Sequence, residues 1–244
     1  MEATRPLTRG IIKGRQLVNS TLQEPLRLLA TQHSRLCPRQ VLGVRIGLAG
    51  VMALPRAASD GPKGLLVILE TDGCFADGVS AATGCTVGKR TLRVEDYGKV
   101  AATFVDVKRE QAVRIAPRLD VRQRAHLYAP GESRHYFAQL HGYQVMPDHE
   151  LLNIQPVCLS TTVAEIISRA GLRVTCQSCG EEIMNEREVR RAGQLLCRTC
   201  AGDSYYVPTR EHSNGGNQAA QRLLPVGHIT GVEQRNGSHS PTNI

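Results

Sequence analysis

Two pairs of cysteines near the C-terminus constrain the fold of this chain more than any other feature of its sequence. Cys176 and Cys179 form one C-x-x-C motif, Cys197 and Cys200 form another, and 17 residues separate the two pairs. Two intervening residues let a single turn present both sulfurs to one ion, and two such turns complete the tetrahedron that Zn²⁺ adopts. The segment is too small for an apolar core of its own, so metal binding is expected to supply its folding energy. Four thiolates leave no open position on the metal, which predicts a structural zinc.

The charge of this cysteine-rich segment argues against binding to nucleic acid. Between Leu172 and Tyr206 five arginines are balanced by five acidic residues, although the whole chain has a formal net charge of +8. A finger that binds phosphates needs an excess of positive charge. A finger that contacts protein or covers a site is therefore favoured over one that reads DNA.

The sequence predicts a cytoplasmic protein without a membrane span. The longest strongly apolar run is Leu65 to Leu69, far short of the roughly 20 residues that a spanning helix needs. The N-terminal residues carry charge but no apolar core of a secretory signal. In a reducing compartment the eight cysteines are expected to act as ligands or reactive thiols and not as disulfides.

Upstream of the finger, short helices and strands without regular alternation predict an α+β domain with a mixed sheet. Pro38 suits the first turn of a helix, and apolar residues follow it at helical spacing. Two further helices are expected over 74–83 and 134–146. Strands are expected over 65–71 and, as two stretches interrupted at 96–98, over 91–107. Residues 147–157 are expected to form a connector.

Changes in composition divide the chain into five expected parts. These are an N-terminal arm over 1–28, an α+β metal-binding core over 29–160, a linker over 161–171, the zinc finger over 172–207 and a largely disordered tail over 208–244. The tail is rich in Gly, Asn, Ser and Gln, a composition that cannot bury enough apolar surface to fold.

The stretch TGCTVGK, residues 83–89, does not fit a phosphate-binding loop. Only three residues separate Gly84 from Gly88, and Lys89 is followed by Arg90 where a P-loop has Ser or Thr. What remains is Cys85 in a turn flanked by glycines, beside two cations that would lower the pKa of its thiol.

Two other segments carry the same chemistry. His33 and Cys37 are four residues apart, a spacing that lets both face one ion on a helix; alternatively, Cys37 is the N-cap of a helix that begins at Pro38. Cys74 follows the predicted strand over 65–71, and Asp77 comes one turn later. Histidine, thiolate and carboxylate together suit zinc or another borderline transition metal. Each residue alone is also compatible with an ordinary buried thiol or a hydrogen-bonded surface group.

Together these blocks resemble the family of the E subunit of formylmethanofuran dehydrogenase over about residues 30–207. By position, His33 and Cys37 match the H-x-x-x-C-P of that family, Cys74 and Asp77 its C-x-x-D, and Cys85 its T-G-C-T-x-G-K. The resemblance implies an α+β core with a metal-binding cleft, a C-terminal treble-clef zinc finger and, commonly, a homodimer.

Two positions depart from the pattern of the family. Arg35 stands where members often have a second histidine, and Arg39 where they often have glycine. The missing imidazole removes one potential metal ligand. The arginines, together with Lys89, favour an anionic ligand near the cleft.

Three functions follow as hypotheses. The first is a metal-binding accessory protein or subunit associated with a molybdenum or tungsten oxidoreductase, or with one-carbon metabolism, whose partners would be subunits of such an enzyme. Its core would hold a second metal of unknown identity through His33, Cys37, Cys74 and Cys85, with Lys89 and Arg39 as anion contacts. The second is a metal-dependent enzyme that acts on a formyl or carbonyl substrate, with Asp77 as the catalytic base. The third is a zinc-finger transcriptional regulator, which the neutral finger disfavours.

Overall fold

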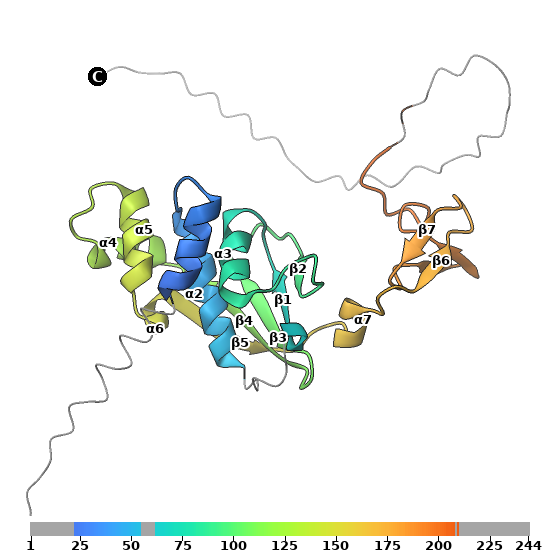
Figure 1. The fold of residues 1–244 in the computed structure, drawn as a ribbon, viewed down its shortest axis with the longest axis horizontal. Helices are drawn as coiled ribbons and strands as arrows, with labels where there is room; N and C mark the ends of the chain where they lie inside the picture. The colour runs from blue at the N-terminus through green and yellow to red at the C-terminus, as the bar shows by residue number, and fades with distance from the viewer. Residues whose placement is uncertain (1–21, 55–61, 208, 210–244) are drawn as a thin grey trace, which may run out of the picture. The chain divides into compact units, whose positions relative to one another are not determined.

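The computed structural model describes residues 22–54, 62–207 and 209, shown as the coloured ribbon in Figure 1. The chain separates into two compact units: the first runs to Arg173 and includes Met184–Glu186, and the second comprises Val174–Ile183 and the residues from Arg187 onward. Most of the predicted arm and nearly all of the predicted tail lie outside the described residues.

A five-stranded mixed sheet forms the centre of the first unit (Figure 1). Its strands are β1 (Leu65–Leu69), β2 (Leu92–Val94), β3 (Ala102–Asp106), β4 (Gln111–Pro117) and β5 (Leu152–Val157), in the order β2-β1-β3-β4-β5. Only the β1–β2 pair is parallel; the other three pairs are antiparallel. The expected α+β class with a mixed sheet is confirmed, and so are the three strands predicted between residues 65 and 107.

Helices cover one face of this sheet and form the main core with it. The face contributes Val67, Phe104 and Ile115, which pack with Val41 and Val44 of α2 (Pro38–Ala53). Pro38 is the first residue of α2, as predicted, because the N–H that proline lacks has no partner at that position. A preceding helix over 22–32 buries three leucines in the same core, so the boundary expected at residue 28 falls inside this helix.

Glycines allow α2 and α3 (Cys74–Thr83) to approach backbone to backbone. A Cβ atom at Gly43 would lie 2.4 Å from the carbonyl oxygen of Phe75, and one at Gly78 would lie 2.3 Å from the carbonyl oxygen of Gln40. One turn further along α2, Gly47 faces the last turn of α3. Because the contacts advance in the same direction along both helices, α2 and α3 run parallel and their N-termini lie at the same end.

Among the residues that the structure describes, those on the opposite face of the sheet are covered at one end only. Leu66, Val105 and Ala112 pack against Val163 of α7 (Val163–Ile167), a short helix whose N-terminus is closed by a Thr162–Glu165 capping box. α7 lies within the segment predicted to be a linker. Beyond this cluster the same face continues with side chains that remain partly open to solvent.

A second group of helices connects β4 to β5: α4 (Val121–Tyr128), α5 (His135–Val145) and α6 (Asp148–Leu151). Arg45 of α2 is buried and connects this group to α2. It donates hydrogen bonds to the carbonyl oxygens of Tyr143 and Met146 at the end of α5. The helix predicted over 134–146 is confirmed. The connector expected over 147–157 is wrong, because this segment forms α6 and β5. β5 is an edge strand with four consecutive exposed residues, so it lacks the alternation that marks a half-buried strand.

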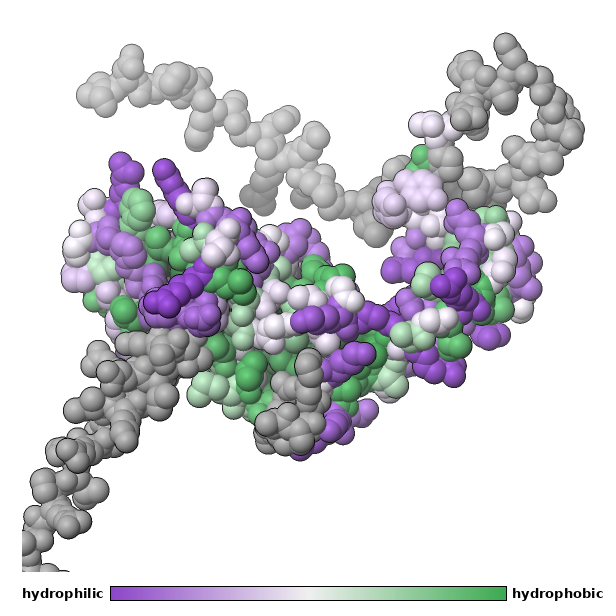
Figure 2. Space-filling model, viewed as in Figure 1, coloured by the Kyte–Doolittle hydropathy of each residue, from purple (hydrophilic) through white to green (hydrophobic). Residues whose placement is uncertain are grey.

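The second unit is built around two small β-ribbons. One pairs β6 (Arg173–Thr175) with β7 (Glu182–Met184), and the other pairs β8 (Val189–Arg191) with β9 (Gln194–Leu196). Its buried apolar cluster has three members, Cys176, Ile183 and Leu196. Most of the visible surface of this unit is hydrophilic (Figure 2). So small a core confirms that the four-cysteine module needs another source of stability.

Candidate metal centres

The four cysteines of the second unit bring their sulfur atoms together as one donor set. The sulfur atoms of Cys176, Cys179, Cys197 and Cys200 all lie within 4.8 Å of one another, and those of Cys179 and Cys197 are 3.9 Å apart. Four Zn–S bonds of the usual length give a tetrahedron with edges of about 3.8 Å. The geometry therefore fits one zinc ion held by all four thiolates.

Two equivalent turns bring these sulfurs together. The N–H of Gly180 donates to the carbonyl oxygen of Cys176 at 3.0 Å, and the N–H of Ala201 donates to that of Cys197 at 2.9 Å. Gly180 has φ +78°, a conformation that glycine adopts without the steric cost a side chain would add. Each C-x-x-C motif therefore closes as a turn whose two sulfurs project to the same side.

Backbone N–H groups and neighbouring thiols change the pKa values of two of these cysteines in opposite directions. The N–H groups of Cys179 and Cys197 lower the pKa of the Cys176 thiol to about 6. The Glu181 N–H favours the thiolate of Cys179, but hydrogen bonds with neighbouring thiols, that of Cys176 first, outweigh it and raise the pKa of Cys179 to about 12. The four cysteines therefore differ in acidity, and zinc binding requires each ligand thiol to lose its proton.

In the first unit, the parallel packing of α2 and α3 brings two of the predicted ligands together. Cys37 is the N-cap of α2, where its N–H donates to Gln40 Oε1 at 2.9 Å, and Cys74 is the first residue of α3. A hydrogen bond with the Cys37 side chain is the main cause that raises the pKa of Cys74. Of the two alternatives for Cys37, the structure therefore shows the N-cap.

His33 and Asp77 form a second contact at this end of the helix pair. His33 lies in the bend before α2, and its Nε2 is 3.2 Å from Oδ2 of Asp77 in the first turn of α3. The charge of Asp77 also contributes to the raised pKa of Cys74. We call His33, Cys37, Cys74 and Asp77 the α2–α3 cluster. Within the described residues, only the finger draws three or more candidate ligand atoms within 4.8 Å of one another, so the cluster consists of two contacting pairs.

Cys85 is the predicted ligand that the structure places elsewhere. Its sulfur donates to the carbonyl oxygen of Leu65 at 3.8 Å, and its side chain is 2 % exposed within the main core. It follows the C-terminus of α3, whereas Cys74 begins that helix. Ten helical residues span about 15 Å, so Cys85 and Cys74 cannot bind one ion. The thiol of Cys85 instead fills part of the core.

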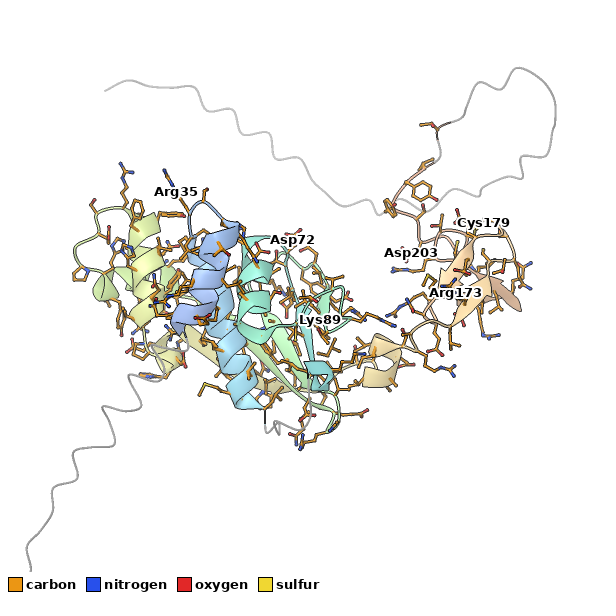
Figure 3. The ribbon with its side chains drawn as sticks, viewed as in Figure 1. Arg35, Asp72, Lys89, Arg173, Cys179 and Asp203 are labelled. Carbon is orange, nitrogen blue, oxygen red and sulfur yellow. The ribbon has the colours of Figure 1, made fainter. Side chains whose placement is uncertain are left out.

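The two predicted anion contacts lie at opposite ends of the helix pair. Arg39 is exposed in the first turn of α2, beside Cys37. Lys89 follows the C-terminus of α3, away from Arg35 and Asp72 at the other end (Figure 3), and its Nζ lies 3.4 Å from the carbonyl oxygen of Gly84. Gly84 ends α3 with φ +69°, so the TGCTVGK stretch begins at a helix C-terminus, where carbonyl groups repel anions.

Two features of the site region were not predicted from the sequence. Arg114 of β4 makes a bidentate ion pair with Glu70, which follows β1, with N–O distances of 2.5 and 2.7 Å. His126 and His135, on α4 and α5, have ring nitrogens 2.8 Å apart. For the Arg114–Glu70 pair, the local signal in the sequence was an arginine within the mostly apolar strand QAVRIAP. The partners in both pairs meet only in the folded chain.

Comparison with known proteins agrees with this division into two parts. Residues 32–152 match the family model described as FmdE, molybdenum formylmethanofuran dehydrogenase operon. Over these residues the chain is similar to the FmdE family. Residues 170–206 match the prokaryotic dksA/traR C4-type zinc finger. The resemblance noted in the sequence is thereby confirmed, and the whole α2–α3 cluster lies within the FmdE domain.

Two individual proteins are similar to this chain. A crystal structure of an FmdE-like protein of the tungsten formylmethanofuran dehydrogenase type, from Syntrophus aciditrophicus, is 20 % identical, with a TM-score of 0.52 over 85 % of this chain and 100 % of the other. That likeness shows the fold. A probable S-adenosyl-L-methionine-binding protein of Archaeoglobus fulgidus is 29 % identical over 200 residues, which cover 73 % of this chain and 52 % of the relative. This chain thus spans about half the length of that relative. Within the described residues, no helix combines the length and the apolar character needed to cross a membrane.

Proposed function

We propose that this metal-binding FmdE-type protein is an accessory protein or subunit that serves a molybdenum or tungsten oxidoreductase, or one-carbon metabolism. The observation that carries the proposal is the α2–α3 cluster, in which the Cys37–Cys74 contact lies beside the His33–Asp77 contact. The FmdE match and the FmdE-like structural neighbour support the assignment to this class of protein. The zinc of the finger is structural, so any metal chemistry would belong to the core.

The donor set of the cluster suits a second metal ion. One imidazole, two thiols and one carboxylate are the ligands of zinc and other borderline transition metals. The four residues are partly or fully exposed at the surface, so an ion could reach them without opening the core. Cys37 and Cys74 stand at the N-termini of α2 and α3, so both sulfurs lie at the same end of the helix pair. Arg39 would attract an anion to the same end.

Metal content of the full chain tests this proposal. We expect two metal ions per chain in the wild type, measured by inductively coupled plasma mass spectrometry after purification without chelators. Cys37→Ser with Cys74→Ser should remove one ion and leave the zinc of the finger. Cys85→Ser is the matched control: it removes a core-domain thiol remote from the cluster and should keep both ions. A single ion in the wild type that is retained in the Cys37/Cys74 double variant would refute the second metal site.

The His33–Asp77 contact also supports a second candidate function, a metal-dependent enzyme that acts on a formyl or carbonyl substrate. The carboxylate of Asp77 is half-exposed and lies against an imidazole that can orient it. In that case Asp77→Asn should abolish turnover while the metal content stays unchanged. Loss of metal in this variant would instead identify Asp77 as a ligand.

Homodimers and complexes with molybdenum or tungsten enzyme subunits are part of the same proposal. Light scattering coupled to size-exclusion chromatography would give the mass of the particle, alone and with a candidate enzyme. Because the Archaeoglobus fulgidus relative is named as a probable S-adenosyl-L-methionine-binding protein, that compound belongs among the ligands to be tested.

A further inference from the structure

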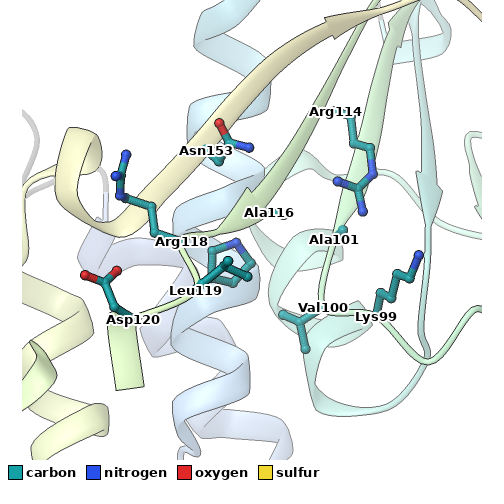
Figure 4. A pocket seen from close by; sticks show the side chains of 10 residues that line it. Lys99, Val100, Ala101, Arg114, Ala116, Arg118, Leu119, Asp120 and Asn153 are labelled. Atoms are coloured by element: carbon teal, nitrogen blue, oxygen red, sulfur yellow. The ribbon is translucent and has the colours of Figure 1, made fainter. Parts of the chain in front are cut away.

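The open end of the second sheet face contains a pocket of about 720 Å³ (Figure 4). Arg114 and Ala116 are alternate residues of β4 and therefore project from the same face, and Asn153 lies directly opposite Ala116 on β5. α7 covers this face only at its other end, around Ala112. The volume is in the range of sites that hold small molecules, about 300–1,000 Å³.

Arg114 is held in place within this pocket. Its Nε and one terminal nitrogen donate to the two carboxylate oxygens of Glu70, at 2.5 and 2.7 Å. This pair raises the pKa of Arg114, and the side chain of Glu70 is only 13 % exposed. A guanidinium has five N–H donors, so three remain outside the ion pair. The remaining donors are pre-oriented, which lowers the entropy cost of binding an oxyanion.

The charges of the pocket favour an anion. Its lining has three cations, Lys99, Arg114 and Arg118, against one carboxylate, Asp120. Glu70 lies outside the lining and offsets the charge of Arg114. The positive charge available to a ligand is therefore mainly that of Lys99 and Arg118, which lie on opposite sides of the pocket (Figure 4).

The one carboxylate of the lining is itself partly neutralised. Asp120 lies 3.8 Å from Arg124, a cation outside the lining that is also paired with Glu150. The side chain of Asp120 is more than half exposed, so water and salt screen its charge. Its repulsion of a bound anion is therefore weaker than the combined attraction of Lys99 and Arg118.

The rest of the lining is apolar. Ala101 and Ala116 form part of the floor, and the side chain of Leu119 is fully exposed at the rim. An inorganic anion would leave these surfaces in water, whereas a ligand with an organic part would cover them. The amide of Asn153 adds two N–H donors and a carbonyl acceptor to the lining.

We propose that this pocket binds an organic phosphate of nucleotide size. The phosphate dianion lies between Lys99, Arg114 and Arg118, and the organic part lies over Ala101, Ala116 and Leu119. Phosphate monoesters carry close to two negative charges at neutral pH, which matches the charge of Lys99 and Arg118, and the arginine fork suits phosphate oxygens. This inference does not rest on a metal in the α2–α3 cluster, because none of those four residues lines the pocket.

Binding of adenosine 5′-monophosphate to the zinc-loaded full chain tests the proposal. Isothermal titration calorimetry at constant ionic strength should give an affinity at least tenfold higher than for adenosine, which lacks the phosphate. Inorganic phosphate should compete, and succinate should bind at least tenfold more weakly. Lys99→Gln and Arg118→Gln should each weaken binding about fivefold or more, because both residues are exposed and each loses one direct contact.

Two further variants distinguish direct contact with the phosphate from a general effect of the protein's net charge. Lys63→Gln removes the same charge at an exposed position outside the pocket and should change the affinity less than twofold. Arg114→Lys keeps a cation against Glu70 but loses the fork, and should weaken binding while the melting temperature confirms folding. Equal binding of adenosine, or equal weakening by Lys63→Gln, would overturn the proposal. Succinate that binds as tightly as the nucleotide would overturn the phosphate in favour of a dicarboxylate, and no binding of either phosphate at millimolar concentration would exclude the site.

Discussion

Gly43 of α2 and Gly78 of α3 face each other so closely that a Cβ atom on Gly43 would lie 3.0 Å from the Cα of Gly78. No larger residue pair can reproduce this backbone contact without moving the helices apart. The contact sets the parallel alignment of α2 and α3, and thereby the approach of Cys37 to Cys74 at their N-termini. The geometry of the α2–α3 cluster thus depends on two residues that have no side chain.

Adding one methyl group at this contact should disturb both stability and the cluster. We expect Gly78→Ala to lower the free energy of unfolding by about 1–3 kcal/mol, the usual cost of overpacking. The new Cβ would meet the carbonyl oxygen of Gln40 at 2.3 Å, a backbone atom that cannot rotate away. Urea denaturation measures the change. Gly131→Ala is the control, because a Cβ there meets nothing within 4 Å; equal effects of the two substitutions would contradict this account.

Removing one thiolate should release the zinc of the finger and unfold only that module. Cys197→Ser is expected to lose one zinc per chain, because three remaining thiolates bind the ion more weakly. Without the zinc, an apolar core of three buried residues is too small to keep the module folded. Metal analysis and nuclear magnetic resonance spectra would follow zinc content and the two β-ribbons separately. Cys158→Ser serves as the control, since this thiol is exposed and lies outside the cysteine cluster. Retention of zinc and of the β8–β9 ribbon in Cys197→Ser would count against the four-thiolate site.

Asp106 should make the stability of the core domain depend on pH, with part of the stability lost in acid. Its fully buried carboxylate accepts hydrogen bonds from the N–H groups of Lys108 and Arg109 and from the guanidinium of Arg109. Burial by itself would raise the pKa of Asp106, but these bonds, led by that of the Arg109 side chain, outweigh it and lower the pKa. The stabilisation is therefore complete above the unfolded pKa of about 3.9 and is lost as the pH falls through the lower folded pKa.

The variant Asp106→Asn tests this pH dependence. It should be less stable than the wild type at pH 7 by about 1.5–3 kcal/mol, since it loses charge-assisted hydrogen bonds. The difference should shrink as the solution is acidified below about pH 4. Asp96→Asn is the control, because Asp96 also accepts a backbone N–H, from Gly98, but at an exposed turn. A stability difference for Asp106→Asn that does not change between pH 7 and pH 3 would exclude the carboxylate as its cause.

Arg45 should be essential for holding α5 against α2. Its side chain is 8 % exposed and also pairs with Asp148 at 2.7 Å, besides its bonds to the carbonyl oxygens of Tyr143 and Met146. Arg45→Met would leave these buried carbonyl groups without a donor, and we expect a loss of about 3 kcal/mol in thermal or chemical unfolding. Arg27→Met, at an exposed helical position, should be nearly neutral. A neutral effect of Arg45→Met would show that packing alone holds the helices.

Features that depend on a few neighbouring residues could be predicted from the sequence. The C-x-x-C turns need only four residues each, and Gly180, directly after the first motif, has a positive φ that glycine adopts without strain. Pro38 marked the start of α2, and the apolar run of β1 is long enough to be buried on both faces. Each of these signals comes from local geometry or from the side-chain pattern of a single element. Such signals are present in the sequence regardless of how the element packs in the fold.

The arrangement of the core candidates, in contrast, was decided by tertiary packing. Cys74 and Cys85 are near in sequence, yet α3 separates them, while Cys37 and Cys74 meet because glycines bring two helices into backbone contact. The pairing of Arg114 with Glu70 likewise requires β1, β3 and β4 to align in one sheet. The sequence by itself determined the types of ligand and the closed zinc site. Only the tertiary structure decided which distant side chains share a surface, because that depends on contacts between elements that no spacing along the chain records.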